Sequence, residues 1–131
     1  MTPVPVPATE LDKWLPQIGW HIESFCRNGQ WEPDDFIGQI RSRDRQLWLV
    51  VDDEVKAALV TSVLGDRLNT VQLSHCCGKG MGEWLHLWPV IEAWARDIGA
   101  QRIEAITRPG WERVLKDMGL KKTHVVLEKR L

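Results

Sequence analysis

The sequence predicts one domain of the mixed α/β (α+β) class, with a mostly antiparallel central sheet flanked by helices. In the first third of the chain, apolar residues recur at helical spacing, and short runs rich in Val and Leu then replace that pattern. After residue 83 helical segments alternate with such runs, which is typical of a β-α-β unit. A length of 131 residues suits a single hydrophobic core.

The first segment, residues 1–8, holds three prolines and is expected to form a flexible, extended arm outside the domain of residues 9–131. A helix is predicted from Thr9 to Arg27, because apolar residues follow helical spacing there. We expect Pro16 to bend or divide this helix.

The remaining elements follow from the same two periodicities and from the glycines and prolines between them. A short helix is predicted at 34–42 and an antiparallel meander of three strands comes next. The predicted strands are 46–51, 55–64, 70–76, 102–107 and 123–131, and the later helices are 83–98 and 109–118.

Composition limits the function. The net charge is −1, from 17 basic and 18 acidic residues, which argues against nucleic-acid binding. No apolar run approaches the roughly 18 residues that span a bilayer, and the N-terminus lacks the pattern of a signal peptide. We therefore expect a cytoplasmic protein without membrane contact. The three cysteines are an odd number and predict reduced thiols.

The stretch HCCGKGMGEWL, residues 75–85, places Gly78, Gly80 and Gly82 directly before a predicted helix. Such a turn can bind an anion, because helix N-termini offer unpaired N–H groups and the positive end of a dipole. It can equally be a tight turn without a ligand. The spacing fits neither a Walker A loop, which needs Lys-Ser or Lys-Thr, nor a Rossmann fingerprint.

This element order, together with CGKGMGEWL, resembles the GNAT superfamily of acetyl-CoA-dependent N-acetyltransferases. The loop of that family reads Arg or Gln, two residues, Gly, any residue, then Gly or Ala; residues 77–82 occupy these places. The C-terminal stretch WERVLKDMGLKKTHVVLEKRL is similar to the family's last helix and closing strand. TRPGWERVL also resembles small GNAT-like proteins of phages and prophages.

The resemblance implies a splayed sheet, open between the strands at 70–76 and 102–107, that admits acetyl-CoA as a co-substrate. Backbone groups of Leu73, Ser74 and His75 would pair with pantetheine amides. The loop would hold the pyrophosphate, with Lys79 adding charge near the 3′-phosphate. The implied loop residues are Cys77, Gly78, Lys79, Gly80, Met81 and Gly82.

Two positions depart from the family's pattern. Cys77 stands where Arg or Gln is usual, and Leu115 stands where the family often has a Tyr general acid; the chain contains no Tyr. Candidates for the general base are His75 and Glu104, and Cys76 is a weak candidate for the acid. His75 can also be an ordinary strand residue, and Glu104 can simply face solvent.

Two functions therefore remain open. The first is transfer of an acetyl group from acetyl-CoA to an unidentified amine. The second is a GNAT-fold protein without catalysis, a binding or structural component that assembles with itself or another protein, for instance in a phage virion. No metal site is predicted, because the adjacent cysteines lack the usual two-residue spacing. The arginines of RSRDRQ, residues 41–46, are interpreted as a solvated face.

Overall fold

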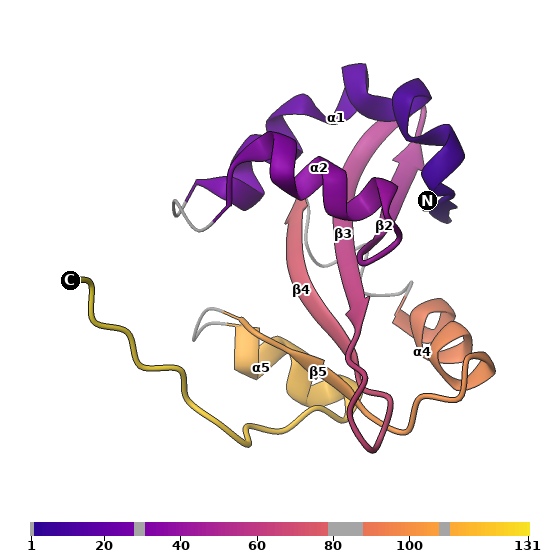
Figure 1. Cartoon of the computed structure of the whole chain (residues 1–131). Coiled ribbons are helices and arrows are strands. Elements are labelled where there is room, and N and C mark those ends of the chain that lie inside the picture. Colours follow the sequence, from indigo (N-terminus) through magenta and orange to yellow (C-terminus); the bar gives the residue numbers. More distant parts are fainter. Residues whose placement is uncertain (1, 28–30, 79–87, 108–110) are drawn as a thin grey trace.

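A computed structural model of the chain describes residues 2–27, 31–78, 88–107 and 111–131 (Figure 1). One five-stranded sheet runs in the order β1-β2-β3-β4-β5, and helices cover both of its faces. The strands are β1 (Thr2–Val6), β2 (Gln46–Asp52), β3 (Glu54–Val63), β4 (Val71–Gly78) and β5 (Ile103–Ala105). The helices are α1 (Leu11–Cys26), α2 (Pro33–Arg41), α4 (Trp88–Asp97) and α5 (Trp111–Leu115), with short 3-10 turns η1 (Ala8–Glu10) and η3 (Lys116–Met118).

The first four strands pair antiparallel, and only β4 and β5 pair parallel. This confirms the predicted fold class, a mostly antiparallel sheet with a later β-α-β unit. The β2–β3 hairpin turns at Asp53, whose φ of 63° lies in the left-handed region. Aspartate tolerates that region better than most residues do. The helix α1 continues through Pro16, so this proline does not divide it.

The proline-rich N-terminus differs from the expectation of a flexible arm. Residues Thr2–Val6 form β1, which pairs antiparallel with β2 at the edge of the sheet. Pro3 and Pro5 alternate with Val4 and Val6, and alternate residues of an edge strand turn their backbone N–H away from the neighbouring strand. A proline at such positions forfeits no ladder hydrogen bond. The expected extended conformation is present, but it is part of the sheet.

Two hydrophobic clusters lie on opposite faces of the sheet. Along β2, Leu47 and Leu49 join the cluster under α1 and α2, whereas Trp48 and Val50 join the cluster under α4 and α5. Successive strand residues point to opposite faces, so a strand covered on both sides must be apolar throughout. The Val- and Leu-rich runs that we predicted as strands therefore lie between the two hydrophobic clusters.

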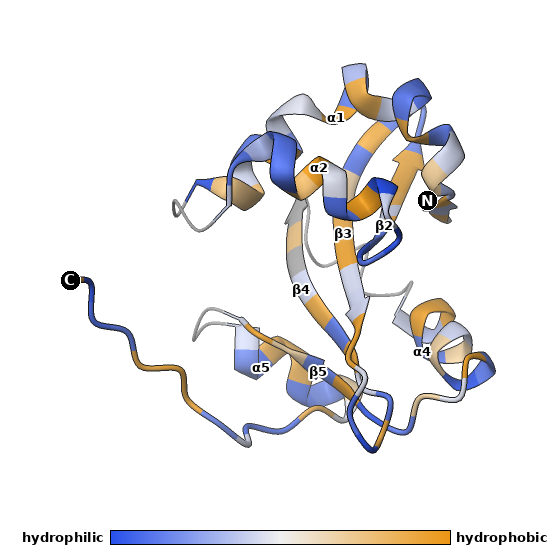
Figure 2. Cartoon of the chain, viewed as in Figure 1, coloured by the Kyte–Doolittle hydropathy of each residue, from blue (hydrophilic) through white to orange (hydrophobic). Residues whose placement is uncertain are grey.

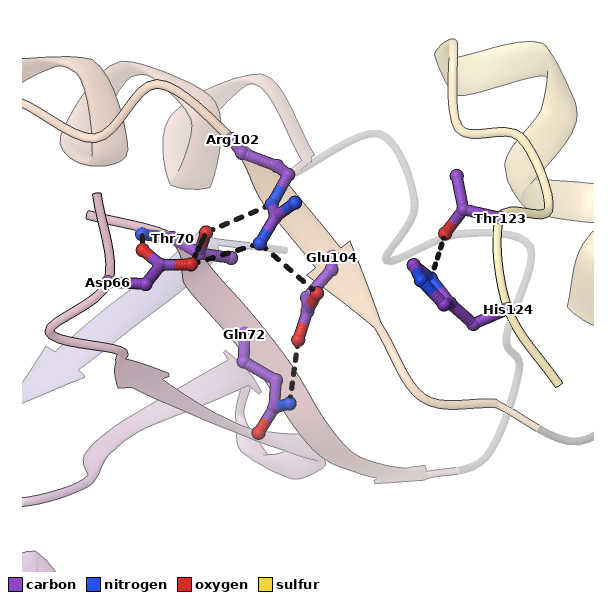
Figure 3. A network of polar contacts seen from close by, with 7 residues as sticks. All are labelled: Asp66, Thr70, Gln72, Arg102, Glu104, Thr123 and His124. Carbon is purple, nitrogen blue, oxygen red and sulfur yellow. Dashed lines mark hydrogen bonds and ion pairs between the residues drawn. The ribbon is translucent and has the colours of Figure 1, made fainter. Parts of the chain in front are cut away.

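The turn between β3 and β4 is tied to the start of β5 by a polar network (Figure 3). Asp66 accepts hydrogen bonds from the backbone N–H of Thr70 at 2.9 Å and from its hydroxyl at 2.8 Å. Arg102 donates to Thr70 Oγ1 at 3.0 Å and to Asp66 Oδ2 at 2.9 Å. The hydrogen bonds from Thr70 and the charge of Arg102 lower the pKa of Asp66 from its ordinary value.

The predicted C-terminal strand is not formed. Residues 120–131, all of which the structure describes, adopt neither helix nor strand, and residues 121–131 are exposed. A strand needs a neighbour to satisfy its backbone groups, and the strand pattern of THVVLEKRL cannot supply one by itself.

We predict that Val6→Ala lowers the free energy of unfolding by about 1–3 kcal/mol, because Val6 is buried in the cluster under α1 and α2. Pro5→Ala changes an exposed residue of the same strand and serves as the control, with an expected change below about 1 kcal/mol. Denaturant unfolding measures both. Equal, small changes would show that the N-terminal segment is a loose arm.

We also predict a specific acid dependence for the Asp66 network. The folded-state pKa of Asp66 is lowered, so its contribution is present above the unfolded pKa and is lost as the pH falls through the folded pKa. Asp66→Asn should therefore be less stable than the parent at pH 7, and the difference should shrink below pH of about 4. Denaturant unfolding between pH 7 and pH 2 tests this, and a difference that stays constant would contradict it.

Candidate functional site

The pairing between β4 and β5 covers only the first part of β4. It joins Val71, Gln72 and Leu73 to Ile103, Glu104 and Ala105, and the N–H of Ile106 donates to the carbonyl of Leu73 at 3.4 Å. β4 then continues to Gly78, paired with β3 on its other side. Within the described residues, the β5-facing edge of 74–78 has no strand beside it. This is the splayed sheet that the sequence led us to expect.

A β-bulge lies in β4 where the splay begins. Thr61 of β3 pairs with Leu73, but the next residue, Val60, pairs with His75, which leaves Ser74 as the additional residue. The Ser74 hydroxyl donates to the carbonyl of Val60 at 3.3 Å. Bulges occur preferentially beside active sites, where they change the direction of a strand.

Arg45 reaches this bulge, and sequence reasoning missed it. Its Nη1 donates to Ser74 Oγ at 3.0 Å, and its Nε donates to Gln39 Oε1. The guanidinium carbon lies 5.1 Å from the ring centroid of Trp31 and 5.2 Å from that of Phe36. Burial lowers the pKa of the Arg45 guanidinium.

The other arginines of RSRDRQ behave differently. Arg41 forms an exposed ion pair with Asp12 of α1 at 2.5 Å, so the solvated-face interpretation suits it. Arg45 makes no ion pair within the part of the chain that is described. The only signals in the sequence for a role of Arg45 are the two aromatic residues upstream, Trp31 and Phe36, whose proximity in space cannot be read from spacing.

Glu104, a predicted general base, lies on the face of the sheet that carries α1 and α2. Its neighbours Ile103 and Ala105 pack into the opposite cluster, so the side chain between them must point the other way. Glu104 Oε1 accepts a hydrogen bond from Gln72 Nε2 at 2.9 Å, and its Oε2 lies 4.0 Å from Arg102 Nη2 (Figure 3). The carboxylate is held by these partners, yet 36% of the side chain remains exposed.

Together these residues form a polar row along β4, consisting of Arg45, Ser74, Gln72, Glu104 and Arg102. The row passes the point where β5 leaves β4. It brings one predicted cofactor-contacting residue, Ser74, and one predicted base, Glu104, to the same face of the sheet. The backbone edge of β4 and the polar side chains therefore lie next to each other where β5 leaves β4.

The other predicted site residues are placed only in part. Leu73 is buried in the cluster under α4 and α5, so its contribution to a ligand can come only from its backbone. The backbone of β4 pairs with β3 at His75, Cys77 and Gly78, opposite Val60, Ala58 and Ala57. The side chains of His75 and Cys77 lie outside the described part of the structure. Lys79, Gly80, Met81 and Gly82 all fall in the segment 79–87, outside the described residues.

Two further residues bear on acid catalysis. Leu115, at the position of the family's tyrosine, is 4% exposed and packs in the cluster under α4 and α5. Cys76 is half-buried, and its side chain packs against the same cluster. The side chain of Leu115 has no proton to donate. Of these two residues, Cys76 has the ionisable group.

Among the described residues, no three His, Cys, Asp or Glu side chains gather in a way that could hold a metal ion. The helices in the described part of the chain are also too short or too polar to cross a membrane.

No family model and no curated protein matches the sequence. Solved structures do match the fold. Ribosomal-protein-alanine N-acetyltransferase from Brucella melitensis aligns with a TM-score of 0.72 at 10% identity, covering 100% of both chains. Glucosamine-6-phosphate N-acetyltransferase from Arabidopsis thaliana aligns with a TM-score of 0.68 at 11% identity, covering 98% of this chain and 97% of the other.

An aminoglycoside N-acetyltransferase solved in complex with CoA aligns with a TM-score of 0.64 at 15% identity, covering 98% of each chain. These similarities span nearly the whole chain but leave few residues in common. They establish the fold and do not by themselves assign a reaction. The chain has the fold of the GNAT N-acetyltransferases.

Proposed function

We propose that the protein is an acyltransferase that moves an acetyl group from acetyl-CoA to an amine. The single observation that carries the proposal is the edge of residues 74–78, which has no strand beside it among the described residues where β5 departs and which leads directly into the glycine-rich segment. An open strand edge offers backbone N–H and C=O groups in a row, and an extended molecule with amide groups can pair with them.

The acetyl-CoA contacts follow from this edge. The pantetheine arm has two amides and would extend along the backbone of Leu73, Ser74 and His75. The segment from Cys77 to Gly82, with Gly78, Lys79, Gly80 and Met81 between them, would supply N–H groups to the pyrophosphate. The similar enzyme solved with CoA supports this choice of co-substrate.

The amine would approach from the face that carries the polar row. Its nitrogen must lose a proton as it attacks the acetyl carbon, so that a C–N bond forms and the C–S bond of the thioester breaks. Glu104 can take that proton directly or through a water, since its carboxylate is partly exposed and held in place by Gln72. The departing thiolate needs a proton in turn, for which Cys76 is the available candidate.

Arg45 has a positioning role in this scheme. Cation–π contacts with Trp31 and Phe36 restrict the guanidinium, which in turn donates a hydrogen bond to Ser74 at the bulge. The backbone of Ser74 is one of the groups expected to bind pantetheine, so its placement bears directly on the acetyl position.

Leu115 supports a second candidate function, a GNAT-fold protein that serves as a binding or structural component. A buried leucine replaces the usual tyrosine, and the chain has no tyrosine elsewhere. Transfer without that acid would rely mainly on positioning, which alone can supply much of the rate. Under the second function, CoA binding or amine transfer is absent.

We predict that acetyl-CoA binds in the micromolar range and that Gly80→Val weakens binding at least tenfold, because a β-carbon would obstruct backbone N–H groups that face a pyrophosphate. Gly65→Val is the matched control, since a β-carbon at Gly65 meets nothing within 4 Å. Calorimetric titration measures all three proteins. Absence of heat at millimolar acetyl-CoA would favour the non-catalytic function, whereas equal affinity of both variants would exclude the glycine-rich segment as the pyrophosphate site.

We predict that Glu104→Gln lowers kcat by about 10²- to 10⁴-fold, the usual contribution of a general base, while acetyl-CoA affinity is retained. Glutamine keeps an oxygen for the hydrogen bond from Gln72, so the local structure should persist. Glu112→Gln, the same change on the exposed surface of α5, is the control.

The assay follows release of the CoA thiol in the presence of a panel of primary amines: polyamines, amino sugars, aminoglycosides and peptides with free N-termini. Full activity of Glu104→Gln would remove Glu104 from catalysis and leave His75 as the predicted base.

A further inference from the structure

Two arginines lie in the polar row along β4, and they differ in the charges around them. Arg102 donates to the carboxylate of Asp66 at 2.9 Å, and its Nη2 lies 4.0 Å from Glu104 Oε2 (Figure 3). Within the described residues, Arg45 donates only to uncharged side chains and forms no ion pair with a carboxylate. The described part of the row therefore holds one positive charge without a negative partner.

Arg45 lies against the body of the molecule. It ends the hydrophilic connection between α2 and β2 (Figure 2), in which residues 42–44 are exposed whereas Arg45 itself is half-buried. The rings of Trp31 and Phe36 lie beside its guanidinium. Cation–π contacts of this kind orient a guanidinium but do not neutralise its charge. Part of the side chain remains accessible to a ligand.

The guanidinium has binding capacity left over. It carries five N–H groups in one plane, and its Nη2 donates to no group of the described residues. Burial lowers the pKa of Arg45, and no carboxylate of the described residues opposes that effect. A charge that is partly removed from water is costly unless an opposite charge approaches it. Carboxylates and phosphates are the anions whose oxygens match the guanidinium fork.

We infer that the amine acceptor also carries an oxyanion, either a carboxylate or a phosphate, and that the Arg45 guanidinium binds it. Arg45 would thereby select the substrate class of the proposed acetyl transfer, on which this inference rests. Arg45 contacts β4 at Ser74. Glu104 contacts the same strand at Gln72, two positions and roughly 7 Å away. The acceptor therefore needs several bonds between its nitrogen and its oxyanion.

Matched pairs of acceptors that differ in charge test the inference. γ-Aminobutyrate and δ-aminovalerate are compared with their amides, and aminopropyl phosphate is compared with aminopropanol. The anionic member of a pair should have a kcat/KM about 10- to 100-fold higher, as expected for a charge-assisted contact. The larger of the two preferences shows whether the oxyanion is a carboxylate or a phosphate. Equal values within every pair would overturn the inference.

Variants separate oxyanion binding from the positioning of Ser74. Arg45→Gln should abolish the preference for the anionic member, whereas a displaced Ser74 would slow both members of a pair alike. Arg43→Gln removes an exposed charge from the same connection and should keep the preference. If circular dichroism shows Arg45→Gln to be unfolded, Arg45→Lys takes its place and should lower the preference, because an ammonium lacks the planar fork. A preference that is unchanged in the Arg45 variant would contradict the inference.

Glu83 is the one residue with a carboxylate side chain outside the described residues. Glu83→Gln tests it as an internal partner of Arg45. A preference for anionic acceptors in Glu83→Gln that is absent from the parent protein would assign Glu83 to Arg45 and would overturn the inference.

A binding measurement makes the test independent of catalysis. δ-Aminovalerate and its amide are titrated into the protein without acetyl-CoA, and NMR follows the indole N–H signal of Trp31, identified with Trp31→Phe. The acid should shift this signal in the parent protein but not in Arg45→Gln, and the amide should not shift it. No shift at high millimolar acid would overturn the inference even if amines are acetylated. A shift without acetylation of any amine would refute the proposed function and leave the oxyanion site at Arg45 standing.

Discussion

The two central strands, β2 and β3, are covered by helices on both faces, and the rest of the structure depends on this. Leu47 and Leu49 face one cluster and Trp48 and Val50 the other, so the same strand anchors α1 and α2 on one side and α4 and α5 on the other. Inside such a strand a polar atom must find a partner. Thr61 satisfies this condition by bonding to both Trp48 and Gln46. The doubly covered strands thus form the centre of the core, and the features that bear on a site lie in β4 and at its edge with β5.

The features of β4 are the ones that bear on a functional site. The bulge at Ser74 and the departure of β5 after Ala105 coincide along β4, so among the described residues a strand edge without a neighbouring strand lies next to a row of polar side chains. Neither feature alone would suggest a site. Their combination provides both an edge for an extended ligand and a carboxylate on the adjoining strand, within a fold that known N-acetyltransferases share.

The central elements were predictable because burial leaves a periodic record in the sequence. The runs at 46–51 and 55–64 became β2 and β3, and the helix predicted at 34–42 became α2. β1 was not recognised, since its prolines suggested polyproline structure and nothing local identifies β2 as its partner. The strand at 123–131 was predicted from a pattern that specifies two faces but no neighbour.

Arg45 was grouped with exposed charges, because spacing cannot show that Trp31 and Phe36 lie beside it. Of the glycine loop, only the backbone of Cys77 and Gly78 in β4 belongs to the described residues, so the anion site remains a prediction.

The parallel pairing of β4 with β5 has a consequence for how the sheet assembles. Antiparallel neighbours such as β2 and β3 join through a single turn residue, whereas Gln72 and Glu104 meet across 32 positions of chain. The entropy lost on closing a loop increases with its length, and only three residue pairs are available here to offset it. Long-range contacts of this kind form more slowly than local ones. The region that would bind both substrates thus coincides with the strand pairing that has the fewest residue pairs in the described part of the sheet.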